Sequence, residues 1–300
     1  MVAVVPTYRP DDALLTGLRA LAPQVDSILV VDDGSPDHSS RVLEWAEELG
    51  FTVLRNPRNE GIAATLNCGI RLALADGADY VLTIDQDTVL PGDYVANCLA
   101  AFGLAPPATR LGVVCTDRVN GEPSIPHAYT AQGLGLVREA IQSGFLISSQ
   151  CLIDCGLFDE RLFIDCVDTE FCLRISLHGY SIAVGPGTDI IHSLGEKMPL
   201  RPFGIARFDE SGNSLTYEYH GPVRRYFIAR NNVDLWFRFA RNRPRWVLSA
   251  IKRELGPTWT TIICGPQRRK QLLATVIGTT HGLARRRGPL GPLLRRILAG

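Results

Sequence analysis

Short apolar segments alternate with helix-like segments in the first third of the chain, and this alternation constrains the fold more than any other feature of the sequence. Each apolar segment has the length and composition of a buried strand, and each interval carries a helical pattern. The strand-like segments are residues 2–6, 27–31, 51–54 and 80–84, and the helix-like ones are residues 12–22, 39–49 and about 59–75. Strands and helices in this order form a mostly parallel sheet with helices on both faces. We therefore predict an α/β fold.

Two carboxylates follow the fourth strand-like segment. Asp85 and Asp87 stand between that segment and the Pro91-Gly92 turn. Alternate side chains of an extended strand share a face, so both carboxylates are expected at the strand's carboxyl end, where open α/β sheets bind ligands. Mg²⁺ accepts one or two protein carboxylates and leaves its other positions to water and phosphate oxygens. The pair therefore indicates a cation that carries a diphosphate, although a simple polar turn accounts for the same residues.

The usual nucleotide-binding loops are missing from this sequence. A dinucleotide-binding turn would place glycines after the first strand, but residues 6–10 are Pro-Thr-Tyr-Arg-Pro. The nearest match, Gly133-Leu-Gly135, has Arg138 where the third small residue belongs. A Walker loop is also missing. These absences exclude NAD, FAD and P-loop binding, and they disfavour a nucleotidyltransferase because its glycine-rich phosphate loop is not present.

The composition is that of a globular chain with a large core. Hydrophobic residues make up 46% of the 300 residues, which suits one large domain or one domain with an appendage. We find no basic leader before the first apolar segment and no apolar run of about 18 residues, so we expect neither a secretory signal nor a spanning helix. The eight cysteines lie in apolar segments without C-x-x-C spacing, which favours reduced core residues of a cytoplasmic protein over zinc or disulfides.

The formal charge of zero hides a division between the two ends of the chain. Residues 1–219 contain 14 Lys and Arg against 29 Asp and Glu, whereas residues 220–300 contain 17 against 2. Such asymmetry indicates that the C-terminal region meets a polyanion. Its arginines are interleaved with Trp, Phe and Leu, which suits helices on anionic lipid, and no nucleic-acid-binding module is recognisable. We therefore expect a peripheral location at the inner face of the cell membrane and no nucleic-acid partner, with a solvated basic bundle as the alternative.

Four motifs, in this order and at these spacings, resemble the donor-binding half of glycosyltransferase family 2. They are Val-Val-Pro-Thr-Tyr at residues 4–8, Val-Val-Asp-Asp-Gly-Ser at 30–35, Asn-Glu-Gly at 59–61 and Asp-Gln-Asp at 85–87. Residues 83–88 and 163–170 are most similar to the family's bacterial rhamnosyltransferases. The resemblance implies an inverting nucleotide-sugar enzyme with the GT-A fold. It also implies a catalytic domain over residues 1–220, with donor and acceptor halves that meet near residue 100, and a basic, mostly helical region over residues 221–300.

The resemblance also implies which residues bind the donor. Thr7 and Tyr8 would line the nucleotide pocket, and Asp32 would accept a hydrogen bond from the base. A different explanation is open for several neighbours: Asp33 can cap the Gly34 turn, Gly61 can begin a helix, and Gly144 can form a bulge in a strand. The implied donor-binding residues are Pro6, Thr7, Tyr8, Asp32, Asn59, Gly61, Asp85 and Gly144.

The implied base and metal ligands complete the expected site. A helix from about residue 167 carries Asp168 in its first turn, and Asp168 aligns with the family's general base. Members often have Glu-Asp where this chain has Val167-Asp168, so assistance from Asp165 or Glu170 stays open. The helix dipole alone also favours acids there. His192 corresponds to a family histidine that can join Asp85 and Asp87 around Mg²⁺ or Mn²⁺, although a lone histidine is more often a packing residue.

The predicted function is hexosyl transfer in cell-surface glycan synthesis. The resemblance implies transfer of L-rhamnose from dTDP-rhamnose to a hydroxyl of a polysaccharide or lipid-linked acceptor. UDP-galactofuranose or a UDP-hexose is the alternative donor. A non-catalytic nucleotide-sugar-binding subunit is the alternative function, because Val167 replaces an acid. The family often forms dimers, so a homo-oligomer is also expected.

Overall fold

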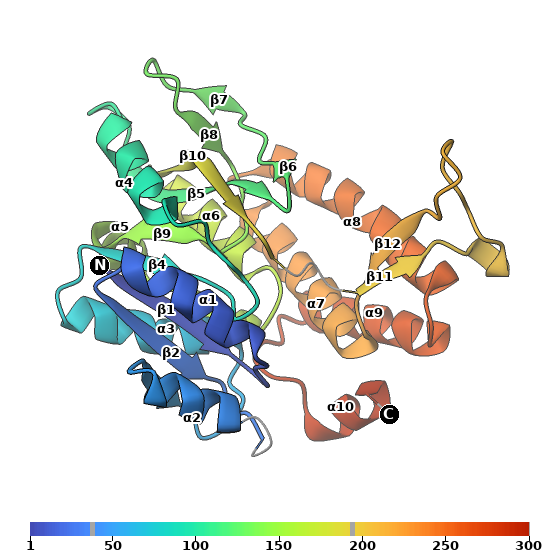
Figure 1. Cartoon of the computed structure of the whole chain (residues 1–300). Coiled ribbons are helices and arrows are strands. Elements are labelled where there is room, and N and C mark those ends of the chain that lie inside the picture. The colour runs from blue at the N-terminus through green and yellow to red at the C-terminus, as the bar shows by residue number, and fades with distance from the viewer. Residues whose placement is uncertain (37–39, 193–195, 300) are drawn as a thin grey trace. The chain divides into compact units, whose positions relative to one another are not determined.

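The computed structural model describes residues 1–36, 40–192 and 196–299, and the chain divides into two compact units (Figure 1). The first unit is Met1–Glu160 with Val167–Ser193, and the second is Arg161–Cys166 with Leu194–Gly300. The second unit therefore includes a short segment from the middle of the chain. The predicted division into a catalytic domain over residues 1–220 and a basic region over residues 221–300 concerns function and stays a prediction.

A large sheet forms the centre of the first unit. Its strands are β1 (Val2–Thr7), β2 (Ser27–Asp32), β3 (Thr52–Arg55), β4 (Tyr80–Thr83), β5 (Leu111–Val119), β6 (Glu122–Pro123), β7 (Ala128–Tyr129), β8 (Gly135–Val137), β9 (Phe145–Ser148) and β10 (Ser181–Ile190). Among the described residues the order is β3-β2-β1-β4-β9-β5-β10-β8-β7, with β6 paired to β5. The first four strands pair in parallel, as do β5 and β10, whereas β9, β8, β7 and β6 pair antiparallel with their neighbours.

Helices cover both faces of this sheet, as predicted. They are α1 (Ala13–Leu21), α2 (Ser40–Glu48), α3 (Ile62–Ala75), α4 (Tyr94–Leu104), α5 (Ser149–Cys155) and α6 (Val167–Leu177), and a short 3₁₀ turn at Ala22–Gln24 extends α1. Ala3 and Val5 of β1 join the core cluster that contains residues of α1, α2 and α4. On the other face α3 lies close to β1, because a side chain at Gly69 would meet Cγ1 of Val4 at 2.5 Å. Strands buried on both faces explain the continuous apolar segments of the sequence.

The strand and helix bounds of the first 84 residues agree closely with the prediction. The fourth strand differs in one detail that matters for the site, because it ends at Thr83. The backbone carbonyl of Asp85 accepts a hydrogen bond from the amide of Thr88 at 3.1 Å, so residues 85–88 form a turn. Asp85 and Asp87 therefore lie in a turn after the strand, and not on one face of an extended strand as expected.

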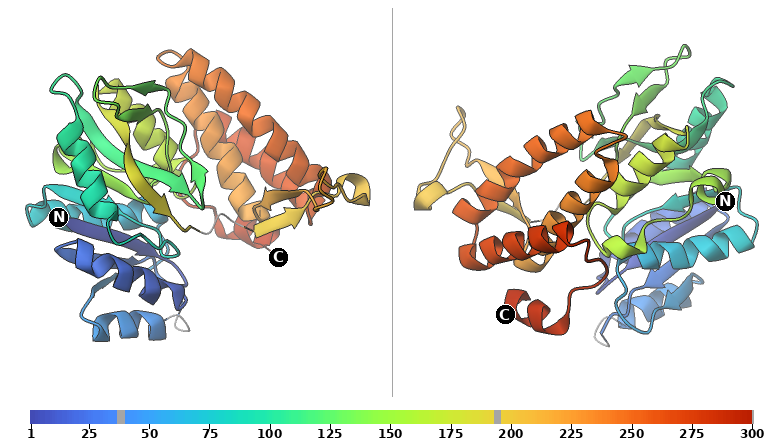
Figure 2. Two further views of the ribbon diagram at one scale, coloured as in Figure 1. Left: turned by 45° about the horizontal axis from the view of Figure 1, so that its top comes forward. Right: turned by 180° about the vertical axis from the view of Figure 1, so that it is seen from behind.

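The second unit is a helical bundle with a two-stranded hairpin (Figures 1 and 2). Its elements are β11 (Glu196–Pro199), β12 (Thr216–Tyr219), α7 (Pro222–Phe239), α8 (Pro244–Cys264), α9 (Arg268–Leu283) and α10 (Pro292–Ala299), with a 3₁₀ turn at Pro202–Gly204. Helices α7 and α9 pack closely, because a Cβ at Gly278 or Gly282 would lie 2.5 or 2.6 Å from a carbonyl oxygen of α7. In the described part of the chain, no helix has the length and apolarity needed to cross a membrane.

Candidate active site

Asp85, Asp87 and His192 form a cluster at the end of β4. The chain before His192 returns to the turn through an isolated bridge between Val89 and Ile191. Nδ1 of His192 lies 3.3 Å from Oδ1 of Asp87, and Nε2 lies 3.8 Å from Oδ2 of Asp85. One ligand atom from each of the three residues lies within 4.8 Å of the other two. Two carboxylates and an imidazole form a donor set that suits Mg²⁺ or Mn²⁺.

The electrostatics of the cluster suit a bound cation. Burial raises the pKa of Asp85 to about 6, and the nearby charges of Asp87 and Asp168 add to this rise, while His192 opposes it. Burial and neighbouring negative charges disfavour the ionised form of a carboxyl group. A divalent cation between such carboxylates favours the ionised form again. The residues present therefore fit the metal ion expected from the sequence.

Three polar residues hold this cluster in place, and sequence reasoning did not assign them a role. The side-chain amide of Gln142 donates to Oδ1 of Asp85, and the hydroxyl of Ser143 accepts a hydrogen bond from the amide of Asp85 at 3.0 Å. The hydroxyl of Thr88 lies 2.8 Å from both Oγ of Ser143 and Nδ1 of His192. Such partners of metal-ligating groups orient them for binding. In the sequence, their role is indicated by no more than the two polar residues Gln142 and Ser143 shortly before the apolar segment that forms β9.

The residues expected around the nucleotide lie at the carboxyl ends of β1 and β2. Thr7 pairs with Asp32 in the register of the two strands, and Oγ1 of Thr7 lies 3.3 Å from Oδ1 of Asp32. Asp32 is buried and also accepts hydrogen bonds from the amide and hydroxyl of Ser35 at 2.9 and 2.5 Å. The amide of Tyr8 donates to Oε1 of Gln86 at 2.8 Å. The structure thus brings Thr7, Tyr8 and Asp32 together and links them to the turn of the two carboxylates.

Asp33 holds the loop that contains Asn59. It accepts hydrogen bonds from the amides of Glu60 and Gly61 at 2.8 and 2.9 Å, whereas the amide of Ser35 in the adjacent turn donates to Asp32. Its burial raises its pKa, and these two amides oppose the rise. Gly61 precedes α3 with φ of 93°, a conformation that favours glycine, which agrees with a helix-start role. Oδ1 of Asn59 is buried and has no hydrogen-bond partner among the described residues.

Gly144 lies next to the cluster, where β9 begins beside the end of β4. Its amide donates to the carbonyl of Thr83 at 2.7 Å, and its own carbonyl accepts from the hydroxyl of Tyr94 at 2.6 Å. With φ of 91° it directly precedes β9, so it is not a bulge within a strand. A side chain at this position would collide with the Tyr94 hydroxyl. The glycine is therefore explained by close packing beside Asp85.

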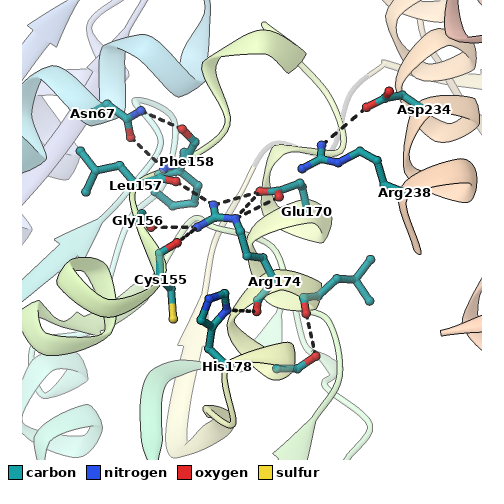
Figure 3. Close-up of polar contacts among 12 residues, drawn as sticks. Asn67, Cys155, Gly156, Leu157, Phe158, Glu170, Arg174, His178, Asp234 and Arg238 are labelled. Atoms are coloured by element: carbon teal, nitrogen blue, oxygen red, sulfur yellow. Dashed lines mark hydrogen bonds and ion pairs between the residues drawn. The ribbon is translucent and has the colours of Figure 1, made fainter. Parts of the chain in front are cut away.

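The three acids near the start of α6 have different partners. Glu170 is fully buried, and its carboxylate accepts from Nε of Arg174 at 3.0 Å (Figure 3). Arg174 also donates to the carbonyls of Cys155, Gly156 and Leu157 and so fixes the chain where it leaves α5 (Figure 3). Asp165 belongs to the second unit, where Nε of Arg224 donates to it at 3.0 Å. Both residues considered as assistants of Asp168 are thus paired with arginines.

Asp168 lies in the first turn of α6, as predicted, and is half-buried. Its Oδ1 accepts a hydrogen bond from the amide of Thr169 at 2.7 Å. Its negative charge contributes, as the smallest of several causes, to the raised pKa of Asp85, and both residues belong to the first unit. A carboxylate in this position is a candidate general base.

The sequence of this chain matches known proteins over most of its length. Residues 2–161 match the model of the family described as glycosyl transferase family 2. The chain is 29% identical over 297 residues to the dTDP-rhamnosyl transferase RfbF of Shigella flexneri, which covers 92% of this chain and 94% of the relative. It is 39% identical over 290 residues to the galactofuranosyltransferase GlfT1 of Mycobacterium tuberculosis, which covers 87% of this chain and 92% of the relative.

Solved structures of proteins with bound nucleotide sugars share the fold. The mannosyltransferase PcManGT from Pyrobaculum calidifontis, solved with GDP-Man and Mn²⁺, aligns over 99% of this chain and 78% of its own, with a TM-score of 0.57 and 17% identity. The S. aureus protein TarS 1–349, solved with UDP-GlcNAc, aligns over 94% of this chain and 89% of its own, with a TM-score of 0.53 and 15% identity. These similarities confirm the predicted GT-A fold class.

Proposed function

Because the chain belongs to glycosyl transferase family 2, we propose that it is a metal-dependent, inverting hexosyltransferase that moves a sugar from a nucleoside diphosphate to an acceptor hydroxyl. The observation that carries this proposal is the cluster of Asp85, Asp87 and His192. The charge of Asp168 also contributes to the raised pKa of Asp85. A cation-binding group and a separate carboxylate are the two parts that direct displacement at a sugar carbon requires.

The proposed reaction uses the chain's own residues as follows. Asp85, Asp87 and His192 would hold Mg²⁺ or Mn²⁺, and the bound ion would neutralise charge on the departing nucleoside diphosphate. Asp168 accepts the proton of the acceptor hydroxyl while the acceptor oxygen bonds to the anomeric carbon. The bond from that carbon to the diphosphate oxygen breaks, and its electron pair leaves with the diphosphate. Attack from the side opposite the leaving group inverts the anomeric centre.

The donor of first choice is dTDP-rhamnose. This choice is supported by the similarity to a dTDP-rhamnosyl transferase over 92% of the chain. A second candidate is UDP-galactofuranose, because the identity to a galactofuranosyltransferase is higher, at 39%. Both donors carry a pyrimidine with a ring N–H. This N–H would donate a hydrogen bond to the buried carboxylate of Asp32 in either case. The nucleobase therefore does not distinguish the two candidate donors, so recognition of the sugar has to distinguish them.

A donor panel tests this proposal. The protein is incubated with Mn²⁺, a polyprenyl-linked glycan acceptor and either dTDP-rhamnose, UDP-galactofuranose, UDP-glucose or GDP-mannose. We expect acceptor-dependent release of nucleoside diphosphate with dTDP-rhamnose, and its loss when EDTA is added. Preferential turnover of UDP-galactofuranose would replace the first donor by the second. Binding of a donor without any release would instead identify a non-catalytic nucleotide-sugar-binding subunit.

We also propose that α8 lies on an anionic membrane surface. Leu248, Leu255 and Trp259 are 62%, 52% and 58% exposed, and their spacing places them on one stripe of the helix together with Lys252. The opposite side of α8 contains the buried residues Ala250 and Thr261. An apolar stripe that carries a cation suits lipid, where a lysine can extend to the headgroups, and it suits neither nucleic acid nor a seam between two copies of the chain.

Vesicle flotation tests the membrane proposal. We expect the protein to float with phosphatidylcholine vesicles that contain about a third phosphatidylglycerol, and not with phosphatidylcholine alone. A double variant Leu255→Ser/Trp259→Ser should lose this binding, while Ile125→Ser, which changes an exposed residue of the first unit, should keep it. Equal binding by the double variant would contradict the proposal. A change from dimer to monomer in the double variant would identify a second copy as the partner of this stripe.

A further inference from the structure

A segment of strained backbone precedes the helix that carries Asp168. Phe163, Asp165 and Cys166 have φ values of 69°, 64° and 61°, in the left-handed region that residues with side chains rarely adopt. Backbone of this kind persists only where its surroundings hold it. Val167 follows Cys166 directly and is the first residue of α6. The course of this segment therefore sets how the chain enters the first turn of α6.

The side chain of Asn231 holds this segment by its backbone. Its amide group donates to the carbonyls of Leu162, Ile164 and Asp165 at 3.0, 2.8 and 2.9 Å. All of these atoms belong to the second unit, in which Asn231 lies on α7 and is almost fully buried. The two N–H groups of one side chain are therefore shared among three carbonyls in a segment that has no regular secondary structure after Leu162 to supply partners.

Arg230 fixes the orientation of Asn231. Nε of Arg230 donates to Oδ1 of Asn231 at 2.9 Å, so the amide nitrogen of Asn231 must face the segment. A second nitrogen of Arg230 donates to the carbonyl of Leu162 at 2.8 Å, and a third donates to the carbonyl of Gly288. Arg230 is also buried, and burial lowers its pKa. Two buried polar side chains thus act together to restrain the main chain.

Two further contacts attach the same segment to α7. The rings of Phe163 and Phe227 stack with their centroids 5.0 Å apart and an angle of 17° between planes. Nε of Arg224 donates to Oδ1 of Asp165 at 3.0 Å. Helix α7 is itself held against α9 where Gly278 and Gly282 allow close approach. The segment is therefore anchored along one face of a helix that is fixed in the core of its unit.

We infer that Asn231 is a positioning residue for the transfer reaction, because it fixes the backbone that leads into the turn of Asp168. This inference rests on the proposed function, in which Asp168 accepts the acceptor's proton. Without the three hydrogen bonds of Asn231, the segment can relax toward negative φ and change the direction in which the chain enters α6. A base displaced by about 1 Å loses about two orders of magnitude in rate. Donor binding should not change, because no donor-site or metal-site residue lies in the segment.

The test compares Asn231→Ala with Asn232→Ala. Asn232 is the adjacent residue on α7, and among the described residues its side-chain amide donates within the helix, to the carbonyl of Ile228 at 3.1 Å. Calorimetric titration with nucleoside diphosphate and Mn²⁺ counts the competent donor sites in each variant. We expect kcat per competent site to fall about tenfold to about a hundredfold in Asn231→Ala, with the donor KM unchanged, while Asn232→Ala retains the wild-type kcat. A purely structural role would lower the number of sites and leave kcat per site unchanged.

Two more variants in the same assay separate the possible failures. Asn231→Asp keeps the shape of the side chain but presents oxygen to three carbonyls, so it must lose kcat as well, and it serves if Asn231→Ala does not fold. If Asp168→Asn is inactive while Asn231→Ala and Asn231→Asp match Asn232→Ala per site, the inference on Asn231 is overturned and the proposed function stands. If Asp168→Asn retains turnover, the assignment of the base fails instead, and the role inferred for Asn231 fails with it.

Discussion

At the scale of single residues, the candidate site depends on acids whose roles differ because their partners differ. Glu170 is neutralised by Arg174, Asp33 holds two backbone amides, and Asp168 lies half-buried where its charge reaches Asp85. Glu170 and Asp168 lie two residues apart in the sequence, yet one has a structural task and the other is proposed to have a chemical one. Their burial and partners, more than their spacing in the chain, separate these tasks.

Replacing Asp168 tests its role as the base. Asp168→Asn keeps the size of the side chain and removes its ability to accept a proton at neutral pH. General-base catalysis contributes about a hundredfold to about ten-thousandfold, so we expect kcat to fall by about that factor. The affinity for nucleoside diphosphate with Mn²⁺ should stay unchanged, as calorimetry can measure. Wild-type turnover in this variant would show that another group takes the proton.

A substitution of Gly144 tests the packing beside the cluster. Gly144→Ala places a methyl group against the Tyr94 hydroxyl in a residue with φ of 91°, so both sterics and backbone oppose it. We expect a loss of about 2 kcal/mol or more in the free energy of unfolding, measured by urea denaturation. Gly92→Ala is the matched control, because Gly92 has open space around its Cβ position and no positive φ. Equal stability of the two variants would contradict this explanation of Gly144.

Residue identities allowed part of this site to be predicted. Asp85, Asp87, His192 and Asp168 stand in motifs that resemble a known family, so their proximity could be expected. Gln142 and Ser143 could not be assigned, because their contacts with Asp85 exist only once β9 pairs with β4. The sequence offers a cap of the nearest turn as one explanation of Asp33, whereas its partners lie in a loop that is distant in the sequence.

At the scale of elements, local patterns predicted the strands and helices but not their order in the sheet. The parallel strands β1 to β4 follow from apolar runs and the turns between them. The antiparallel insertion of β9 between β4 and β5 depends on pairing between distant segments, which no local pattern encodes. The end of β4 at Thr83 also escaped prediction, because the apolar residue Ile84 continues the pattern beyond the strand.

A prediction at this scale concerns Arg174, which connects α6 to the chain at the end of α5. Arg174→Ala removes the partner of the fully buried Glu170 and leaves three loop carbonyls without their donor. Breaking a buried pair on one side typically costs about 3–5 kcal/mol, and we expect a loss of this size in urea denaturation. Arg71→Ala, which breaks an exposed pair with Glu160, should cost about 1 kcal/mol or less. Comparable losses in both variants would contradict the role given to Arg174.

At the scale of the whole molecule, the division of charge that is visible in the sequence has a structural counterpart. The acidic part of the chain supplies the sheet and the cluster of Asp85, Asp87 and His192, and the basic part supplies the helices of the second unit. The predicted division into a catalytic and a basic region falls at residue 220, whereas the second compact unit includes Leu194–Gly300, so composition does not give the bounds of the units. The second unit includes Arg161–Cys166 from the middle of the chain. This segment is held by hydrogen bonds from α7 to its backbone, and such bonds produce no periodic pattern in the sequence.

The central claim is that the acids after β4 bind an activated sugar through a divalent cation. Calorimetric titration of dTDP-rhamnose and UDP-galactofuranose into the wild type and Asp87→Ala, each with and without Mn²⁺, tests it most directly. Asp93→Ala serves as the control, because it removes an exposed acid from the same region of the chain. We predict Mn²⁺-dependent binding of a donor in the wild type and in Asp93→Ala, and a loss of at least about tenfold in affinity for both Mn²⁺ and donor in Asp87→Ala. Donor binding of equal affinity in all three proteins, with or without Mn²⁺, would contradict the account.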